Sequence, residues 1–429
     1  MCRELKDSGI PWIGEIPERW GIDTIGNLYT LRTEKVSDKD YAPLSVTKMG
    51  IVPQLETAAK TDDGDNRKLV RVGDFAINSR SDRRGSCGIS TYDGSVSLIN
   101  LVLTPRGQMY PRFYNWLFHT ESFADEFYKW GHGIVDDLWT TRWQEMKRIS
   151  IVSPSYQEQQ RIAEFLDRKC GEVDEMIALQ EQTIEELKAY KQSVITEAVT
   201  KGLNPAAPMC DSGIEWIGSI PEHWEVHPFK AYYKTTKGLN ITKENLVESG
   251  IPVISYGQIH SKLNTGTSIC DELIRYVPET YLASNPECLS KKFDMFFADT
   301  SEDREGAGNM AFIDTDIPIF AGYHTIIARP REEVKTKYFA YLAKTDAWRT
   351  QIRNSISGVK VFSISQKLIN KAYIIIPTPT EQQAIADYLD EKCADIDSLI
   401  QTKQSKIDSL KEYKKSIIYE YVTGKKEVE

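Results

Sequence analysis

The feature that most constrains this chain is an internal repeat, because two separate blocks of sequence occur twice. Residues 7–20 read DSGIPWIGEIPERW and residues 211–224 read DSGIEWIGSIPEHW, identical at eleven of fourteen positions with an offset of 204. Residues 158–170 read EQQRIAEFLDRKC and recur as EQQAIADYLDEKC at 381–393, identical at nine of thirteen positions with an offset of 223. A weaker echo links residues 73–88 with 293–308. Self-similarity of this kind predicts a pseudo-two-fold tandem duplication, each half being a variable region followed by a repeated one.

Each EQQ block opens a long predicted helix. Residues 155–158 (SYQE) and 378–381 (TPTE) fit capping boxes, the second with proline at the first helical position. Apolar residues then recur every seven positions, which is typical of a coiled-coil seam. The predicted seam residues are Leu166, Val173, Ile177, Ile184, Leu187 and Val194 in the first helix, and Leu389, Ile396, Ile400, Ile407, Leu410 and Ile417 in the second. A stripe facing a domain core would look similar. Two such long copies favour an antiparallel coiled coil made by the two helices together.

The variable regions predict a mixed fold. Residues 97–103 and 252–256 are short β-branched runs that predict strands, whereas residues 113–130 and 337–352 have helical spacing and aromatic content. The predicted fold class is α+β, with two α/β domains joined by the two long helices. The expected boundaries are 1–154, 155–203, 204–377 and 378–425. Four tryptophans recur in both halves and are expected to pack the shared scaffold: Trp12, Trp20, Trp216 and Trp224.

Charge is distributed unevenly along the 429 residues, whose net charge is −9. The whole chain therefore lacks the basic footprint that nucleic-acid-binding proteins usually show. The helix at 158–201 has ten acids and six bases, and the one at 381–420 has nine acids and six bases. These helices are expected to be solvated struts or protein-binding surfaces. Residues 66–86 instead carry six bases and two acids. Such a cluster by itself is usually a solvated surface, but its place in one variable region of a duplicated chain strengthens the expectation that it contacts phosphates or guanine edges. The corresponding stretch at 299–305 is acidic.

Sequence motifs of catalysis are missing. The chain has no Pro-Pro, which the Asn/Asp-Pro-Pro-aromatic motif of amino-methyltransferases requires, and no GxxxxGK[ST] phosphate loop. His223 and His227 lie four residues apart but do not fit HExxH, and the segment from Asp390 to Lys392 is only superficially similar to a nuclease motif. We expect no catalytic residue and no bound metal or cofactor.

Cysteine usage and hydropathy indicate the compartment. The seven cysteines contain no CxxC pair, no apolar run approaches the ~20 residues of a membrane span, and no signal peptide is recognisable. A cytoplasmic protein without a membrane partner is expected.

Taken together, the duplicated half, the capped EQQxIAxxLD helix and the DSGIxWIGxIPExW opening resemble the DNA-specificity subunit of type I restriction–modification enzymes, over essentially the whole chain. The resemblance implies two target-recognition domains, each reading one half of an asymmetric, bipartite double-stranded DNA sequence. It implies a coiled coil that sets their separation and docks two methylation subunits, which bring S-adenosylmethionine and methylate adenine. Restriction subunits that translocate DNA with ATP and Mg²⁺ would join them, and the chain itself would not be an enzyme.

The expected DNA contacts lie in the variable regions, where each residue could also be an ordinary surface or core residue. They are Ser79, Arg80, Ser81, Arg83 and Arg84 in the first domain, and Tyr256, Gln258, His260, Thr300, Ser301, Arg304 and Lys360 in the second. Two rival hypotheses are a coiled-coil scaffold without DNA readout and a divergent modification enzyme. A specificity subunit whose partner fuses cleavage and methylation belongs to the same class as the main hypothesis.

Overall fold

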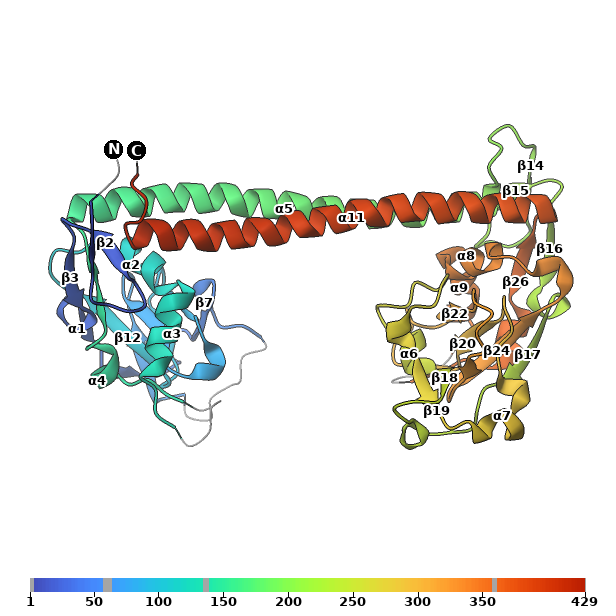
Figure 1. Cartoon of the computed structure of the whole chain (residues 1–429), viewed down its shortest axis with the longest axis horizontal. Helices are drawn as coiled ribbons and strands as arrows, with labels where there is room; N and C mark the ends of the chain where they lie inside the picture. Colours follow the sequence, from blue (N-terminus) through green and yellow to red (C-terminus); the bar gives the residue numbers. More distant parts are fainter. Residues whose placement is uncertain (1–3, 57–63, 134–138, 357–360, 429) are drawn as a thin grey trace. The chain divides into compact units, whose positions relative to one another are not determined.

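The computed structural model describes residues 4–56, 64–133, 139–356 and 361–428. It divides into two compact units: unit 1 contains Met1–Glu181 and Lys403–Glu429, and unit 2 contains Gln182–Thr402. The two long helices, α5 (Tyr156–Lys201) and α11 (Pro379–Val422), each contribute one part to either unit (Figure 1). Each unit is therefore a variable region packed on paired segments of both helices.

Unit 1 contains thirteen described strands and four short helices besides its parts of α5 and α11. The strands are β1 (Leu5–Asp7), β2 (Glu15–Pro17), β3 (Gly21–Thr24), β4 (Tyr29–Leu31), β5 (Lys35–Val36), β6 (Leu44–Thr47), β7 (Gly50–Pro53), β8 (Arg67–Val70), β9 (Phe75–Asn78), β10 (Cys87–Ile89), β11 (Gly94–Val96), β12 (Asn100–Pro105) and β13 (Ser150–Ser153). The helices are α1 (Ile25–Leu28), α2 (Pro111–Phe118), α3 (Glu121–Lys129) and α4 (Trp143–Met146).

A four-stranded antiparallel sheet of order β10-β9-β12-β4 forms the centre of unit 1. Successive side chains of a strand point to opposite faces, and both faces of β9 are covered. Phe75 and Ile77 pack with the aromatic residues of α2 and α3, whereas Ala76 packs with the smaller sheet β11-β8-β5. Burial on both faces explains why the FAIN segment is continuously apolar until Asn78.

Unit 2 is built from the same kinds of element. Its strands are β14 (Met209–Asp211), β15 (Ser219–Pro221), β16 (Glu225–Pro228), β17 (Tyr233–Lys237), β18 (Ile251–Ile254), β19 (Arg275–Val277), β20 (Met295–Ala298), β21 (Thr300–Ser301), β22 (Met310–Phe312), β23 (Phe320–Ala321), β24 (Thr325–Pro330), β25 (Phe362–Ser363) and β26 (Tyr373–Ile376). Its helices are α6 (Tyr256–Ile259), α7 (Thr280–Ser284), α8 (Tyr338–Lys344), α9 (Asp346–Arg353) and α10 (Gln366–Lys371).

The duplication extends to topology. The central sheet of unit 2 has the order β17-β24-β20-β22, so β20, β22, β24 and β17 take the places of β9, β10, β12 and β4. Hairpin β14-β15 repeats β1-β2, and the pair β16-β26 repeats β3-β13. The predicted mixed α/β fold is confirmed at this level.

Two predicted single helices are each divided by a threonine. Residues 113–130 form the end of α2 and then α3, because the side chain of Thr120 accepts a hydrogen bond from the Phe123 backbone N–H. Thr345 caps α9 in the same way, accepting from the Trp348 N–H. A side chain that satisfies a helix N-terminus starts a new helix at that point. The two threonines fix which residues of α2–α3 and α8–α9 correspond.

Within each unit α5 and α11 lie side by side in opposite directions (Figure 1). In unit 1 the rings of Phe165 and Tyr421 are 4.4 Å apart, and Lys414 Nζ lies 2.6 Å from Asp174. In unit 2 Lys191 Nζ lies 2.6 Å from Asp397. The two ion pairs are equivalent under the offset of 223. All twelve predicted seam residues are buried or half-buried along these helices.

The repeated tryptophans do not all behave alike. Trp20 and Trp224 are buried beside Gly424 and Gly202, glycines with a φ of +74° that follow the ends of α11 and α5. Trp12 is half-buried, with its ring 5.9 Å from that of Phe123. Trp216 is 38% exposed, so it is covered less completely than Trp20 and Trp224. None of the helices in the described part of the chain has the length and apolar character needed to cross a membrane.

Candidate nucleic-acid interface

The loops that follow β9 and β20 are held in the same way in both units. In unit 1 the Thr141 N–H donates to the Ser79 carbonyl at 3.0 Å, and in unit 2 the Ile364 N–H donates to the Asp299 carbonyl at 2.7 Å. An isolated bridge joins Arg80 to Thr140, and β21 pairs with β25 at the corresponding place. In each unit, a segment distant in the sequence thus pairs with the start of the loop. This pairing fixes the start of the loop, whereas the residues at the loop tip can vary.

The first loop carries the five residues predicted in unit 1. Ser79 is buried and its hydroxyl donates to the Ile99 carbonyl, so this side chain serves the loop's own structure. Arg80 is half-buried, and Ser81 begins a short 3₁₀ helix that ends at Arg83. The Arg83 side chain is 69% exposed, with Asp82 3.7 Å away. Arg84 forms an ion pair with Asp125 on α3. Arg83 is the most exposed of these three arginines.

The other cations of the basic stretch have structural partners. The Arg67 guanidinium donates to Ser95, and burial lowers the pKa of Arg67. Lys68 donates to the Asn100 carbonyl at 2.6 Å, and Arg71 pairs with Asp93 at 2.7 Å. The net charge of the stretch therefore overstates its basic surface, which comes from Arg80, Arg83 and Arg84.

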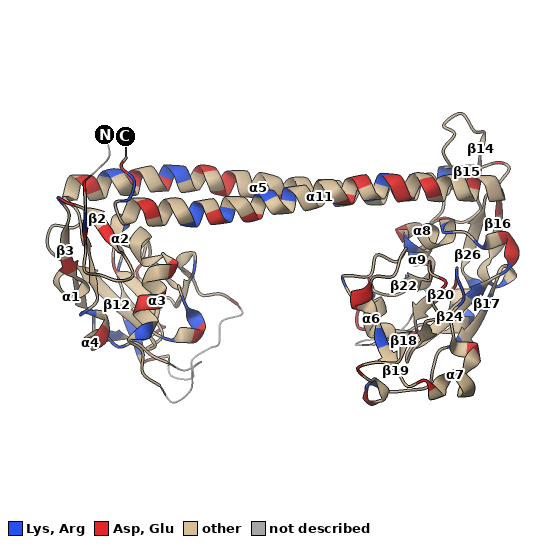
Figure 2. Ribbon diagram, in the orientation of Figure 1, with Lys and Arg blue, Asp and Glu red and all other residues tan. Residues whose placement is uncertain are grey.

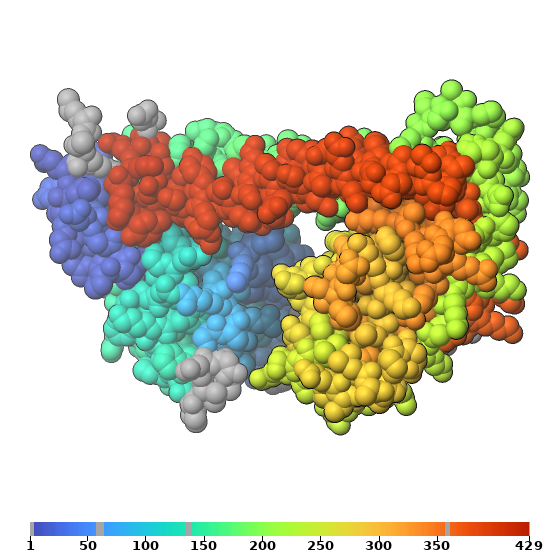
Figure 3. Space-filling view, turned by 45° about the vertical axis from the view of Figure 1, so that its right-hand side comes forward, coloured from blue at the N-terminus to red at the C-terminus, as the bar shows by residue number. Residues whose placement is uncertain are grey.

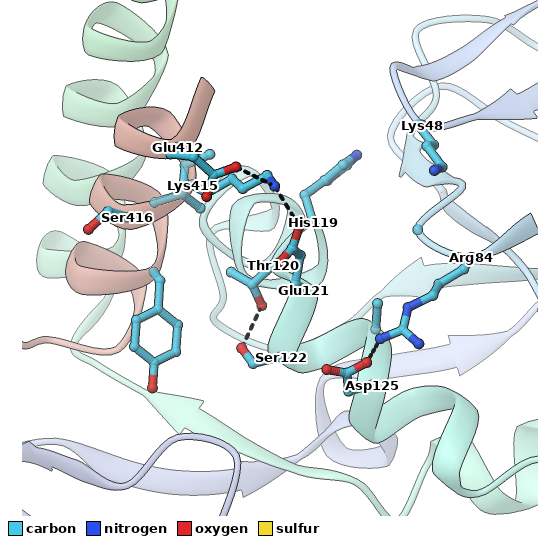
Figure 4. A pocket seen from close by; sticks show the side chains of 14 residues that line it. Lys48, Arg84, His119, Thr120, Glu121, Ser122, Asp125, Glu412, Lys415 and Ser416 are labelled. Atoms are coloured by element: carbon cyan, nitrogen blue, oxygen red, sulfur yellow. Dashed lines mark hydrogen bonds and ion pairs between the residues drawn. The ribbon is translucent and has the colours of Figure 1, made fainter. Parts of the chain in front are cut away.

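A cavity of about 960 Å³ opens beside the first loop, between α3 and α11 (Figure 4). Of the three cations among its described lining residues, two are paired, Arg84 with Asp125 and Lys415 with both Glu121 and Glu412 at 2.9 Å, and Lys48 is the third. These hydrogen bonds raise the pKa of Lys415. With three carboxylates among its lining residues, this cavity has no excess of positive charge to attract an anion.

Unit 2 gathers predicted residues from two segments around a cavity of about 610 Å³, lined by Tyr256, His260 and Ser301 among others. His260 Nε2 lies 2.8 Å from the Thr300 carbonyl, and its Nδ1 lies 3.0 Å from the amide nitrogen of Asn309. A carbonyl on one side and an amide donor on the other favour a neutral ring with its proton on Nε2. The half-buried ring of Tyr256 is 5.4 Å from His324. Gln258 caps α6, its side-chain oxygen accepting from the Ser255 N–H.

The remaining predicted residues of unit 2 surround the same loop. Ser301 is buried and donates to the Asp303 carbonyl, while the Thr300 hydroxyl donates to the carboxylate of Asp299. Arg304 is exposed, and its guanidinium donates to the Arg353 carbonyl at 3.0 and 3.1 Å. Lys360 lies outside the described residues.

Sequence reasoning missed two arginines on α9. Arg353 lies 3.1 Å from the carboxylate of Glu305 and 2.9 Å from that of Asp346, which ties the second loop to the helix. Arg349 also lines this cavity. In the sequence, two arginines four residues apart on a short helix look like an ordinary solvated face. The one sequence feature that could have indicated their position is the nearby Thr345, which caps the helix.

Aligning the loops by their common frame exposes a reversal of charge. Residues 81–84 read SDRR and residues 301–304 read SEDR, so Arg83 corresponds to Asp303. The carboxylate of Asp303 accepts the Gly306 N–H, and neighbouring Glu302 is exposed. Arginine donates to guanine, whereas carboxylates accept from the amino group of cytosine. The two loops therefore offer different chemistry at equivalent positions.

The two histidines considered as metal ligands have separate partners. His223 Nε2 lies 2.9 Å from Glu381, and His227 Nε2 lies 2.7 Å from Glu225. Within the described ranges, no group of three or more His, Cys, Asp or Glu side chains is placed to hold a metal ion.

The fold and its paired loops define a class of duplicated protein in which two variable domains share one repeated frame. Known proteins of this class are similar to this chain. Residues 221–422 match the family model for the type I restriction modification DNA specificity domain. The chain is 25% identical over 283 residues to the type I restriction enzyme MjaVIII specificity subunit of Methanocaldococcus jannaschii, covering 65% of this chain and 62% of that protein. It therefore spans less than two thirds of that relative's length.

Two further matches cover nearly the whole chain. A second specificity subunit of Methanocaldococcus jannaschii, MjaX, is 23% identical over 457 residues, which is 96% of this chain and 95% of that protein. A chain in a solved structure of a type I restriction–modification system has a TM-score of 0.70 with 14% identity, covering 95% of this chain and 98% of that one. The family model and these relatives support a DNA-specificity subunit of a type I restriction–modification system, and the solved structure supports the same fold.

Proposed function

We propose that this chain directs a type I restriction–modification enzyme to an asymmetric, bipartite DNA target, with each variable domain reading one half-site. The observation that carries this proposal is the pair of equivalent loops after β9 and β20, held by the same backbone contacts yet opposite in charge at Arg83 and Asp303. A repeated frame with different loop tips suits the reading of two different sequences by similar means.

The paired helices are proposed to hold methylation subunits. Figure 2 shows acidic residues spread along both helices, which makes them poor contacts for a phosphate backbone. Exposed apolar side chains interrupt this acidic surface at equivalent positions, Met176 with Leu399 and Tyr190 with Tyr413, each 40–51% exposed. Atoms of α11 form part of the outer surface in both units (Figure 3). Two equivalent patches, one in each unit, suit two copies of one partner.

Chemistry is assigned to the partners. S-adenosylmethionine would bind the methylation subunits, which methylate adenine in each half-site, and ATP and Mg²⁺ would bind the restriction subunits. Since the chain carries a net charge of −9, we expect the partners to supply much of the positive surface that DNA requires. The isolated chain should then bind DNA weakly and the assembled complex tightly.

The deciding experiment is single-molecule sequencing of modified bases in cells that express this chain with its methylation subunit. We expect methylated adenines in a motif of two short half-sites around a fixed gap. The same methylated motif in cells without this chain would contradict the proposal, as would an assembled complex that methylates nothing.

The coiled coil is proposed to set the gap between the half-sites. Inserting four residues near Gln180 lengthens the helix by ~6 Å. Because the recognition loops are untouched, the half-sites should remain the same while the gap lengthens. The methylated motif of the insertion variant gives both the half-site sequences and the length of the gap. An unchanged gap would exclude a role of the coiled coil in setting it.

Because each unit has its own docking patch, the two patches can be disrupted one at a time. Tyr190→Ala and Tyr413→Ala should each weaken one methylation-subunit site, and the double variant should weaken both. Native mass spectrometry should show loss of one subunit in each single variant and of two in the double. The exposed Tyr92→Ala, away from both helices, serves as a control. Full stoichiometry in the double variant would move the docking site elsewhere.

A further inference from the structure

A second, smaller cavity in unit 2 differs in charge from the others described above. It has a volume of about 180 Å³ and lies between residues 259–266, the start of β22 and the junction of α8 with α9. Lys344 and Arg349 line it, together with Ser261 and Asn264, and the described lining residues include no Asp or Glu. Because no described carboxylate lines the cavity beside these two cations, their positive charge is not compensated within the cavity.

Lys344 has no hydrogen bond or ion pair from its ammonium group within the part of the chain that the structure describes. The side chain is half-buried at the last position of α8. Burial lowers the pKa of Lys344, and the positive charges of Lys191 and Arg349 lower it further. The nearby carboxylate of Asp397 is already bound to Lys191 at 2.6 Å. Taking an ammonium group even partly out of water without a partner is costly, and an anion that joins it reduces this cost.

Among the described residues, the hydrogen-bond partners of the Arg349 guanidinium are carbonyl groups. Its guanidinium donates to the Glu305 carbonyl and, at 3.4 Å, to that of Ala307. Burial lowers the pKa of Arg349 to about 10, and the adjacent Arg353 contributes. The nearest carboxylates are engaged elsewhere: those of Glu305 and Asp346 pair with Arg353. Asp303 accepts the Gly306 N–H. Within the described ranges, neither Lys344 nor Arg349 is paired with a carboxylate of its own.

Part of the cavity wall is fixed by Asn264. Its side-chain nitrogen donates to the carbonyls of Ile259 and Met310 at 2.8 and 2.9 Å, and its oxygen accepts the Gly266 N–H. The Ser261 hydroxyl oxygen accepts the Leu263 N–H, which leaves the hydroxyl proton available to donate. The cavity thus presents two cations and a hydroxyl on a wall held by backbone contacts.

We propose that this cavity is a binding site for a phosphate-class oxyanion, held by Lys344 and Arg349 with Ser261 as a further donor. The oxyanion is either a phosphate of the DNA backbone or a free phosphate. The site belongs to unit 2 alone, because the N-caps Thr120 and Thr345 align Lys344 with His119 and Arg349 with Ala124.

A free anion is tested on the full chain by thermal unfolding with inorganic phosphate, against chloride at equal ionic strength. Phosphate should stabilise the wild-type chain, since a ligand that binds only the native state raises its stability. Lys344→Met should lose this response, with phosphate affinity at least tenfold lower. The matched control is Lys335→Met, because Lys335 is already paired with Glu332 and should respond like the wild type. Without phosphate, Lys344→Met should unfold no earlier than the wild type, which shows that it folds.

A backbone phosphate is tested on the assembled complex with a duplex carrying its methylated motif, and this arm rests on the proposed function. Each phosphate contact contributes about 0.9 to the slope of log affinity against log salt. Lys344→Met should reduce that slope by about this amount and leave the motif unchanged, whereas Lys335→Met should leave both unchanged. A response in either arm supports the site and names the source of the oxyanion. If neither the slope nor the phosphate response changes, the inference is overturned. Absence of DNA binding by the wild-type complex would instead overturn the proposed function, and the phosphate arm alone would then decide.

Discussion

The two units have the same frame, but each pairs its equivalent buried aspartate with an arginine from a different strand. Asp74 of unit 1 and Asp294 of unit 2 are equivalent, buried, and located just before β9 and β20. Asp74 is paired with Arg32, which follows the edge strand β4, whereas Asp294 is paired with Arg329 from the neighbouring strand β24. The buried acid is retained in both copies while its arginine comes from a different strand. The buried carboxylate before each of these two central strands is therefore the fixed feature, and its partner can change.

The additional partners of the two acids are unequal. Asp74 also accepts hydrogen bonds from the Thr104 hydroxyl at 2.9 Å and the Arg71 N–H at 2.8 Å. Beyond Arg329, the carboxylate of Asp294 accepts from the Lys291 N–H at 2.9 Å. Burial raises the pKa of Asp294, against the lowering effect of Arg329. The second unit therefore depends more heavily on its single arginine.

Removing that arginine should have the largest effect on stability. Arg329→Gln leaves a buried carboxylate with one backbone donor, and the loss should be about 3 kcal/mol, as for other broken buried pairs. Arg32→Gln should cost less, because Asp74 keeps two other donors. Urea unfolding followed by tryptophan fluorescence measures both.

The pH dependence of that loss has a definite sign. A carboxyl group whose pKa is raised in the folded state destabilises the fold above that pKa, and protonation relieves the penalty below it. The difference between Arg329→Gln and the wild type should therefore narrow as the pH falls. The double variant Arg329→Gln, Asp294→Asn removes the charge and should recover part of the loss at pH 7. Equal losses in Arg32→Gln and Arg329→Gln would refute the proposed asymmetry.

The loop tips should show a smaller effect, and on DNA affinity alone. Arg83→Ala removes an exposed guanidinium that lies 3.7 Å from Asp82, and a base contact is worth ~1–3 kcal/mol. The change should relax one position of the first half-site and leave the second unchanged. Fluorescence anisotropy with the assembled complex gives the affinity, and the methylated motif gives the position.

Arg84→Ala is the matched comparison for Arg83. The Arg84 guanidinium is paired with Asp125, so less of its charge is available to DNA and its loss should be smaller. If both variants kept the original affinity and target, this loop would not belong to the interface.

The sequence predicted the frame well because the frame is repeated. Two copies of a capped helix with a seven-residue apolar spacing give the same signal twice, and the structure places all twelve seam residues in buried or half-buried positions. Trp216 shows the limit of this reasoning. It is shared by the two halves, yet it is 38% exposed whereas the repeated Trp20 and Trp224 are buried.

The site could be predicted only in part. A run of charged residues marks the first loop, but the sequence does not show that Arg67 and Arg71 point to Ser95 and Asp93 while Arg83 stays exposed. Lys344 and Arg349 were missed because no run of charged residues marks them in the sequence. They are single cations on short helices, and only folding brings them to one cavity that no carboxylate lines.

The smallest expected effect tests the duplication within the paired helices. Lys191 pairs with Asp397 and Lys414 with Asp174, both at 2.6 Å, and the acid of each pair is more than half exposed. A partly exposed ion pair of this kind contributes ~0.2–1 kcal/mol. Lys191→Met and Lys414→Met should therefore lower stability by similar small amounts, each more at low salt than at high salt. Lys188→Met is the control, since its pair with Glu185 is more exposed on both sides and should be nearly neutral. A clear loss in one variant and none in the other would show that the two ion pairs, though alike in geometry, are not equivalent in energy.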